Sequence, residues 1–131
     1  MAFDFGKQSF SKAAEVGAWV DLVLPNHEKP GVKLHILGGM SQAVKEHDRE
    51  KLRKLTTKKR GKEVEITPEF IEETQVEDAL VRLIGWSGVE SNGKPVEFDK
   101  EVARGYLVEN PWLCAFIMEE SADVQNFPLK P

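Results

Sequence analysis

The sequence contains a single cysteine, Cys114, so the chain cannot form an internal disulfide, and a reducing cytoplasm is its natural compartment. Long apolar runs are also missing. The longest lie within Ala18–Leu24 and Leu113–Met118 and fall far short of the roughly 20 residues that a membrane-spanning helix needs. The first ten residues, MAFDFGKQSF, have neither the basic start nor the apolar stretch of a signal peptide. The sequence therefore predicts a cytosolic protein without a membrane partner.

The composition is that of a folded soluble domain. Apolar residues make up 40% of the 131 residues and charged residues 31%, which excludes a disordered chain. A chain of this length supports one hydrophobic core rather than two. We expect one domain over residues 1–127 and a loose tail over 128–131. Within the domain we expect an extended or β part (1–40), a basic helix and loop (41–66), and a helical part with a turn at Trp86–Phe98 (67–127).

Charge is distributed unevenly along the chain, although the net charge is only −4. Residues 45–62 carry nine basic and three acidic side chains, a net charge of +6, whereas residues 63–131 carry a net charge of −10. This division indicates electrostatic pairing, either within one chain or between neighbouring copies. Two separate solvated faces are the alternative. The candidate protein-interaction residues are Lys51, Lys54, Lys58, Lys59, Arg60, Glu69, Glu72 and Glu73.

The N-terminal part contains two segments with the character of strands. Ala18–Leu24 is rich in aromatic and branched residues, and Val32–Leu37 alternates with a period of two in its first part. The breaker Lys29-Pro30-Gly31 separates them. Two such runs around a Pro/Gly loop predict a hairpin or a pair of antiparallel strands.

The middle of the chain predicts two helices. Ser41 is a plausible N-cap for a polar helix that runs to about Thr56 and has a thin apolar stripe. A short strand is possible at Glu63–Ile66. Thr67-Pro68 combines an N-cap with proline at the first helical position, followed by glutamates where the helix dipole favours them. We expect this second helix to run to about Ile84, to bury Phe70, Ile71, Val76, Leu80, Leu83 and Ile84, and to end at Gly85.

The C-terminal part predicts a tight turn and two more helices. Asn92-Gly93 lies between two short apolar stretches and favours a small hairpin. Asp99 caps a helix to about Val108, and Asn110-Pro111 opens a last helix that fades near Asn126. The expected fold class is α+β and predominantly helical, with an N-terminal β-hairpin or extended strands followed by about four helices.

Residues with catalytic or metal-binding potential form no recognisable pattern. His27, His35 and His47 have no compact metal-ligand spacing, and a second cysteine for a zinc site is missing. Cys114 lies in an apolar run, where a cysteine is usually a small buried hydrophobe. Gly38-Gly39 lacks the context of a phosphate-binding loop. We therefore expect no catalytic residue, no metal ligand and no cofactor, and predict that the protein is not an enzyme.

The basic segment from Lys51 to Lys62 raises the question of nucleic-acid binding. Lysine and arginine supply sequence-independent phosphate contacts, but this segment has no aromatic residue to stack on bases. The whole chain is acidic, which adds long-range repulsion of polyanions. A solvated or protein-contacting basic face is therefore the favoured interpretation, and a small nucleic-acid-binding regulator is the weaker alternative.

The C-terminal half resembles a known family. A helix ends in Leu83-Ile84-Gly85-Trp86, a loop Gly88-Val89…Asn92-Gly93-Lys94-Pro95-Val96-Glu97-Phe98-Asp99 follows, and a short helix leads to Glu109-Asn110-Pro111-Trp112 and a last helix. This order is similar to the tail assembly chaperones of long-tailed, lambda-like bacteriophages and covers roughly residues 68–127. The residues that carry the resemblance are structural: Trp86, Gly93, Pro95, Phe98, Pro111 and Trp112.

The resemblance implies a specific role. Such chaperones act in the host cytoplasm, bind the tape measure protein and keep its hydrophobic helices from aggregating while the tail tube protein polymerises around it. They are mainly helical, self-associate into open or spiral oligomers and are not expected in the mature virion. Many have a longer form made by a programmed frameshift, and this chain looks like a short form. The alternative within the same biology is a head–tail joining or tail-completion component that stays in the virion.

Overall fold

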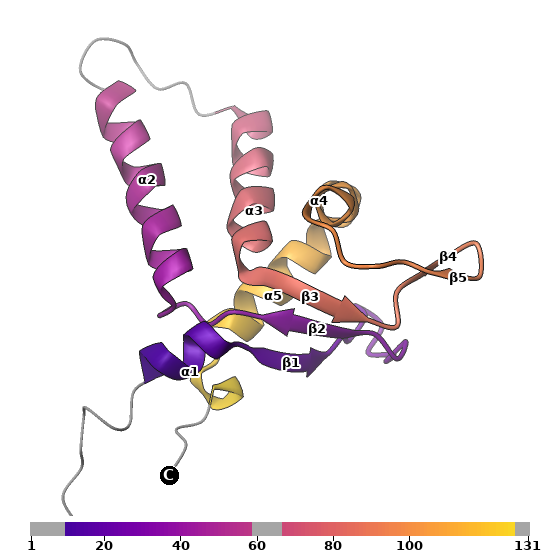
Figure 1. Ribbon diagram of the computed structural model, residues 1–131. Helices are drawn as coiled ribbons and strands as arrows, with labels where there is room; N and C mark the ends of the chain where they lie inside the picture. The colour runs from indigo at the N-terminus through magenta and orange to yellow at the C-terminus, as the bar shows by residue number, and fades with distance from the viewer. Residues whose placement is uncertain (1–9, 59–66, 128–131) are drawn as a thin grey trace, which may run out of the picture.

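The computed structural model describes residues 10–58 and 67–127, and its elements follow the order α1, β1, β2, α2, α3, β3, β4, β5, α4, α5 and a 3₁₀ turn, η1 (Figure 1). Helices make up most of this part of the chain, and a small antiparallel sheet accompanies them. The predicted α+β, predominantly helical fold class is thus confirmed. The possible strand at Glu63–Ile66 and the tail at 128–131 lie outside the described residues.

The sheet contains three antiparallel strands in the order β1-β2-β3. β1 (Ala18–Asp21) and β2 (Lys33–Ile36) form the predicted N-terminal pair, with Val20 opposite Leu34. Alternation along these short strands turns Val20, Leu34 and Ile36 towards the core, while Trp19 and His35 stack on the other face with ring centroids 4.7 Å apart. The strand prediction is confirmed here.

β3 (Leu83–Ser87) corrects the predicted end of the second helix. α3 spans Pro68–Arg82, so Leu83, Ile84 and Gly85 belong to a strand that pairs with β2. The chain leaves the helix because Leu83 is extended, with φ −89° and ψ 113°. The ammonium of Lys100 donates to the carbonyl oxygens of Leu80 and Leu83, which satisfies acceptors that a helix end leaves open.

A short helix, α1 (Phe10–Val16), replaces part of the extended segment expected over residues 1–40. Ala14 is 1% exposed and lies against Gly38, where an added Cβ would be 2.6 Å from the Ala14 Cβ. Gly17 ends the helix in the left-handed region, at φ +80°. Tertiary packing against Gly38 therefore stabilises a helix too short to form alone.

The core lies between the inner face of the sheet and helices α3, α4 and α5. α4 (Lys100–Glu109) contributes Ala103 and Leu107, and α5 (Pro111–Ala122) contributes Cys114 and Ile117. Each of these four side chains is at most 4% exposed. α3 supplies Val76, Ala79 and Leu80 from the side that faces them, and η1 (Val124–Asn126) follows α5.

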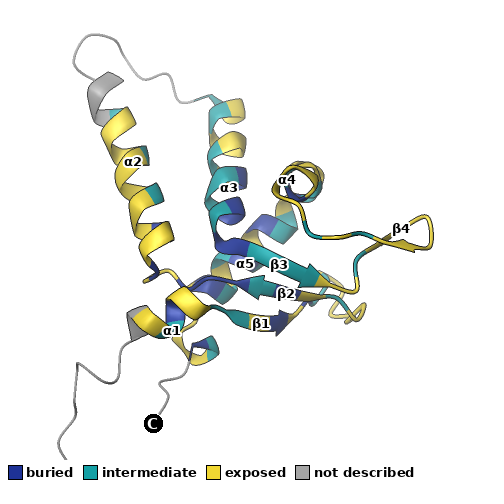
Figure 2. Ribbon diagram, in the orientation of Figure 1, coloured by how far each residue is buried: buried dark blue, intermediate teal, exposed yellow. Residues whose placement is uncertain are grey.

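Helix α2 (Gln42–Lys58) stands beside α3 and is exposed over most of its surface (Figure 2). The Ser41 hydroxyl accepts from the backbone N–H of Val44 at 3.4 Å, as expected of its N-cap. Val44 is fully buried, but Leu52, which the thin apolar stripe included, is 65% exposed. α2 therefore has one narrow contact face, and that face meets α3.

A small hairpin carries the residues of the predicted tight turn. β4 (Glu90–Ser91) pairs with β5 (Lys94–Pro95), and the turn residues Asn92 and Gly93 have φ values of +54° and +77°. Positive φ at both central residues is the pattern of a type I′ turn, which Asn-Gly favours. The hairpin prediction is confirmed.

No helix in the described ranges 10–58 and 67–127 has the length and apolar character to cross a membrane.

Candidate interaction surface on helix α3

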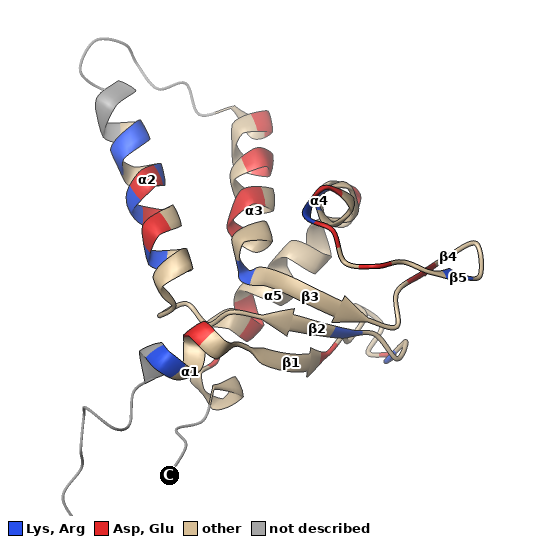
Figure 3. Ribbon diagram, viewed as in Figure 1, with Lys and Arg blue, Asp and Glu red and all other residues tan. Residues whose placement is uncertain are grey.

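α3 is an acidic helix that lies between α2 on one side and α4 and α5 on the other (Figure 3). The Thr67 hydroxyl accepts from the N–H of Phe70 at 3.1 Å, and Pro68 occupies the first helical position. Both features fix the start of the helix, and its N-terminal dipole favours the glutamates of the first turns. The sequence therefore places carboxylates along a helix that three other helices flank.

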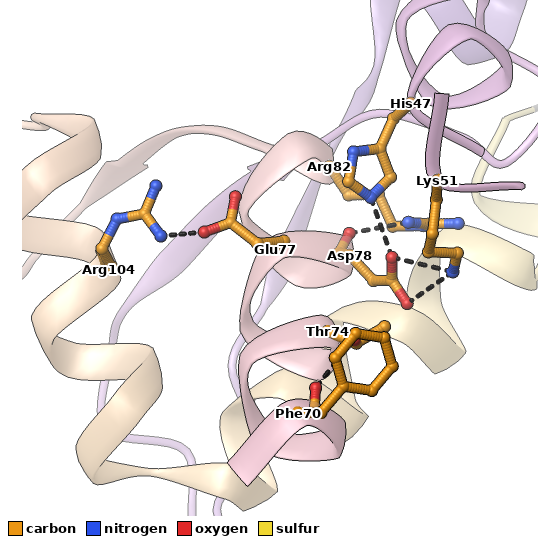
Figure 4. A network of polar contacts seen from close by, with 8 residues as sticks. All are labelled: His47, Lys51, Phe70, Thr74, Glu77, Asp78, Arg82 and Arg104. Atoms are coloured by element: carbon orange, nitrogen blue, oxygen red, sulfur yellow. Dashed lines mark hydrogen bonds and ion pairs between the residues drawn. The ribbon is translucent and has the colours of Figure 1, made fainter. Parts of the chain in front are cut away.

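Asp78 joins α2 to α3. Its carboxylate accepts from His47 Nε2 at 2.8 Å, and both of its oxygens lie 3.1 Å from Lys51 Nζ (Figure 4). The Asp78 side chain is 13% exposed, whereas those of His47 and Lys51 are 23% and 36% exposed. The buried Arg82 guanidinium donates to the backbone oxygen of Asp78 at 2.6 Å. This is the main polar link between α2 and the rest of the described structure.

The same place contains three groups that ligate metals in other proteins. The ligand atoms of His47, Asp48 and Asp78 all lie within 4.8 Å of one another. The sequence did not reveal this cluster, because Asp78 is far away along the chain. The Lys51 ammonium already contacts both oxygens of Asp78, so a metal ion would have to displace a positive charge. We assign no metal to this cluster.

A cleft of about 370 Å³ separates α2 from α3, and we call it the α2–α3 cleft. Leu55 on α2 and Phe70 on α3 are half-buried apolar side chains in its lining. Lys51 and Lys54 lie on the α2 wall and Glu73 and Glu77 on the α3 wall. The cleft therefore offers an apolar strip between a basic and an acidic edge. The remaining lining residues are His47, Glu50, Thr74 and Asp78.

A second depression, of about 560 Å³, lies on the other side of α3, and we call it the acidic groove. Its acidic wall comes from α3, and its apolar part comes from α3, α4 and the start of α5. Arg104 of α4 forms an ion pair with Glu77 across it. The wall consists of Glu69, Glu72, Glu73 and Glu77, and the apolar part of Val76, Leu107, Val108, Pro111 and Cys114.

The structure divides the predicted interaction residues between these two depressions. Lys51 and Lys54 line the α2–α3 cleft, Glu69 and Glu72 line the acidic groove, and Glu73 lines both. Charge pairing between the basic and acidic halves thus occurs at least once within a single chain, between Lys51 and Asp78. Lys59 and Arg60 lie outside the described residues, as does the side chain of Lys58, the last residue of α2.

Sequence reasoning missed seven lining residues of the α2–α3 cleft, among them His47, Leu55, Phe70 and Asp78. A signal for two of them was present, since Val44, His47, Lys51 and Leu55 recur at the spacing of one helix face. Phe70 was expected in the core but is only half-buried, and Ile71, also expected there, is 46% exposed. No local pattern indicated that Asp78 would face His47, because their proximity depends on how the two helices pack.

The residues that carry the family resemblance are spread over three places. Trp86 and Phe98 pack together, Gly93 and Pro95 are exposed in the β4–β5 hairpin, and Pro111 lines the acidic groove. Trp86 Nε1 donates to the Val96 oxygen at 2.8 Å, and the Trp86 ring meets Phe98 edge-on at 4.9 Å. Trp112 packs against the core at the start of α5. Pro111 is in the first turn of that helix, but Asn110 makes no side-chain cap and instead donates to Tyr106 at the end of α4. These residues shape the fold.

Among residues 10–58 and 67–127, two groups have pKa values that their surroundings clearly shift. Burial lowers the pKa of the Lys100 ammonium below its ordinary value of 10.5. Burial also raises the pKa of the Cys114 thiol, against the opposing effect of a backbone hydrogen bond. A buried thiol with a raised pKa forms little thiolate, so its chemistry is that of a packing residue.

The chain matches the family of the YdaY prophage protein over residues 40–130, more than half of its length. This region contains α2, α3 and both depressions described above. The fold and surface define a small, predominantly helical protein with two depressions beside one acidic helix. The chain belongs to the YdaY prophage protein family and is phage-derived. Comparison with curated proteins and with solved structures gave no significant match.

Proposed function

We propose that this phage protein is a non-enzymatic, self-associating tail assembly chaperone that binds tape measure protein in the host cytoplasm. Its phage origin and the resemblance over residues 68–127 support the role. A chaperone for aggregation-prone helices needs an apolar surface that a client helix can reach and leave. It also needs polar edges that keep the unoccupied chaperone soluble.

The α2–α3 cleft carries the proposal. Leu55 and Phe70 form its apolar strip, and charged side chains on both edges keep that strip narrow. α2 contacts the rest of the described structure chiefly through α3 and α1, so a small movement of one helix widens the cleft. An amphipathic client helix would lay its apolar face on Leu55 and Phe70, in the helix-in-groove mode of recognition.

The test is co-expression of this protein with the tape measure protein of the same phage, scoring the soluble fraction and co-purification of the client. The double substitution Leu55→Gln and Phe70→Gln should remove most of the co-purified client. Val124→Gln is the control, because Val124 is 50% exposed on η1 and lines neither cleft nor groove. An equal loss in the control, or no loss in the double variant, would contradict client binding in this cleft.

A second measurement separates the chaperone from a virion component. Mass spectrometry of purified phage particles should find tape measure and tail tube proteins but not this chain, because a chaperone leaves the finished tail. Its stoichiometric presence would instead support a head–tail joining or tail-completion protein. Retention of nucleic acid during purification at moderate salt would favour a nucleic-acid-binding regulator.

A further inference from the structure

We infer that the acidic groove is the docking site for helix α2 of a second copy of this chain, so that copies associate head to tail. The inference rests on the self-association in the proposed function but not on client binding. It follows from the positions of two sets of charged side chains that the structure leaves unpaired within the described residues.

The first set lies on the groove. Glu69 and Glu72 are exposed on its wall, one turn apart, and form no ion pair with any described residue. Glu77, further along the same wall, is already paired with Arg104. The part of the wall formed by Glu69 and Glu72 thus has unpaired negative charge, and Val108, which also lines the groove, is 61% exposed. A cationic helix with a small apolar contact would complement this part of the groove.

The second set lies on α2. His47 and Lys51 turn towards α3, where Asp78 holds them. By helical periodicity Lys45 and Arg49, one turn apart, lie on the opposite face, and both are exposed. Neither forms an ion pair with any residue in the described part of the chain. The face of α2 that points away from its own α3 is therefore the basic one available to a neighbour.

The spacing and size of the two surfaces agree. Glu69 and Glu72 are three residues apart on one helix and Lys45 and Arg49 four apart on another, which separates each pair by roughly one turn, about 5–6 Å. α2 has 17 residues and α3 has 15, so the helices are of similar length, about 22–25 Å. A neighbour's α2 can follow α3 along the groove and place both of its cations opposite both carboxylates.

The two surfaces lie on opposite sides of α3, since α2 stands on one side of it and α4, which lines the acidic groove together with α3, stands on the other (Figure 1). One copy can therefore donate its α2 to the next while it receives an α2 from the previous one. Such head-to-tail contacts produce a ring if the rotation closes and an open helical array if it does not. The contact would use the face of α2 that points away from α3 and the groove side of α3, so neither interface of a copy would lie in its α2–α3 cleft.

Sedimentation velocity on the purified full chain alone, from micromolar to near-millimolar concentrations, tests the inference. Wild-type protein should associate, and association should weaken as sodium chloride is raised, because exposed charges are screened. The double reversals Glu69→Lys/Glu72→Lys and Lys45→Glu/Arg49→Glu should each weaken association about tenfold or more, because two attractions become two repulsions. An equimolar mixture of the two variants should regain association as alternating head-to-tail oligomers, since every contact between unlike copies then joins surfaces of opposite charge.

Matched controls have the same change in net charge at sites away from the interface. Glu90→Lys/Glu97→Lys on the hairpin side and Lys29→Glu/Lys94→Glu at exposed positions should leave association unchanged. Three results would overturn the inference. The wild-type protein could stay monomeric at every concentration, the charge reversals could weaken association no more than their controls do, or the mixture of the two variants could stay monomeric. Because no client is present, these results are independent of the co-purification experiment, and either proposal can fail while the other stands.

Discussion

Replacing Asp78 by asparagine tests how α2 is attached to the molecule. Asparagine keeps the size of the side chain and one carbonyl oxygen, but removes the negative charge and the second acceptor. Lys51 then loses its ion pair, and His47 and Lys51 compete for one oxygen. No apolar contact is removed, so the change isolates the polar link between the two helices.

The burial of the three side chains determines the expected magnitude. Removing one partner of a fully buried ion pair costs about 3–5 kcal/mol, whereas an exposed pair contributes about 0–1 kcal/mol. Asp78 is 13% exposed but Lys51 is 36% exposed, so solvent screens part of the interaction. We expect Asp78→Asn to lower the free energy of unfolding by about 2 kcal/mol. At roughly 4 °C per kcal/mol for a chain of this size, Tm should fall by about 8 °C.

Two measurements check this expectation. Chemical denaturation gives the free energy, and hydrogen exchange shows where protection is lost. Exchange should accelerate in α2 but remain nearly unchanged in β2, because α2 is anchored mainly to α3 while β2 lies in the core. Glu50→Gln is the control, since the Glu50–Arg53 pair on α2 is 55% and 70% exposed and should contribute less than about 0.5 kcal/mol. If Asp78→Asn lowered the free energy of unfolding by no more than Glu50→Gln does, the reasoning would be refuted.

Three further predictions concern backbone, proton and thiol chemistry. Gly88→Ala should cost at least about 2 kcal/mol in urea denaturation and more than Gly93→Ala, because both have positive φ but only the Gly88 Cβ would lie 2.6 Å from the Gly31 oxygen. Since the pKa of Lys100 is lowered on folding, the unfolded chain binds more protons just below pH 10.5. Stability from this group should therefore rise with pH in that window. Relative to Lys100→Met, the denaturation midpoint of the wild-type protein should rise as the pH approaches 10.5; the comparison is needed because the raised pKa of Cys114 acts in the opposite direction in both proteins. The thiol of Cys114 should react with a disulfide reagent only after denaturant is added, as absorbance would show; rapid reaction of the native protein would contradict its burial.

Elements that depend on short sequence signals were predictable. Thr67-Pro68 marks the start of α3 and Asn92-Gly93 the turn of the β4–β5 hairpin, because cap, proline and positive-φ preferences act over a few residues. Asp99 likewise caps α4, with its carboxylate accepting from the N–H groups of Glu101 and Val102. Local chemistry decides each of these outcomes, so the sequence alone contains enough information.

Elements that depend on distant partners were not predictable. Leu83–Ser87 has the composition of a helix end, and it becomes a strand because β2 offers it hydrogen bonds and Lys100 satisfies the end of α3. α1 is a helix because Ala14 packs against Gly38. The α2–α3 cleft likewise depends on tertiary packing, because its two walls are joined by the contacts of Asp78 on α3 with His47 and Lys51 on α2. The charge division predicted that the two halves would pair but could not separate pairing within a chain from pairing between chains.

The position of α3 explains why both kinds of pairing fit in one small protein. Carboxylates around the helix point to two sides, so Asp78 serves α2 of the same chain while Glu69 and Glu72 line the opposite groove. Glu73 and Glu77 line both depressions, and a substitution at either position would disturb client binding and self-association together. Only residues confined to one side, such as Phe70 for the cleft and Glu69 for the groove, can separate the two activities. If the two sides act independently, a variant at Phe70 should impair only client binding and a variant at Glu69 only self-association. The double variant should then lose each activity to the same extent as the corresponding single variant.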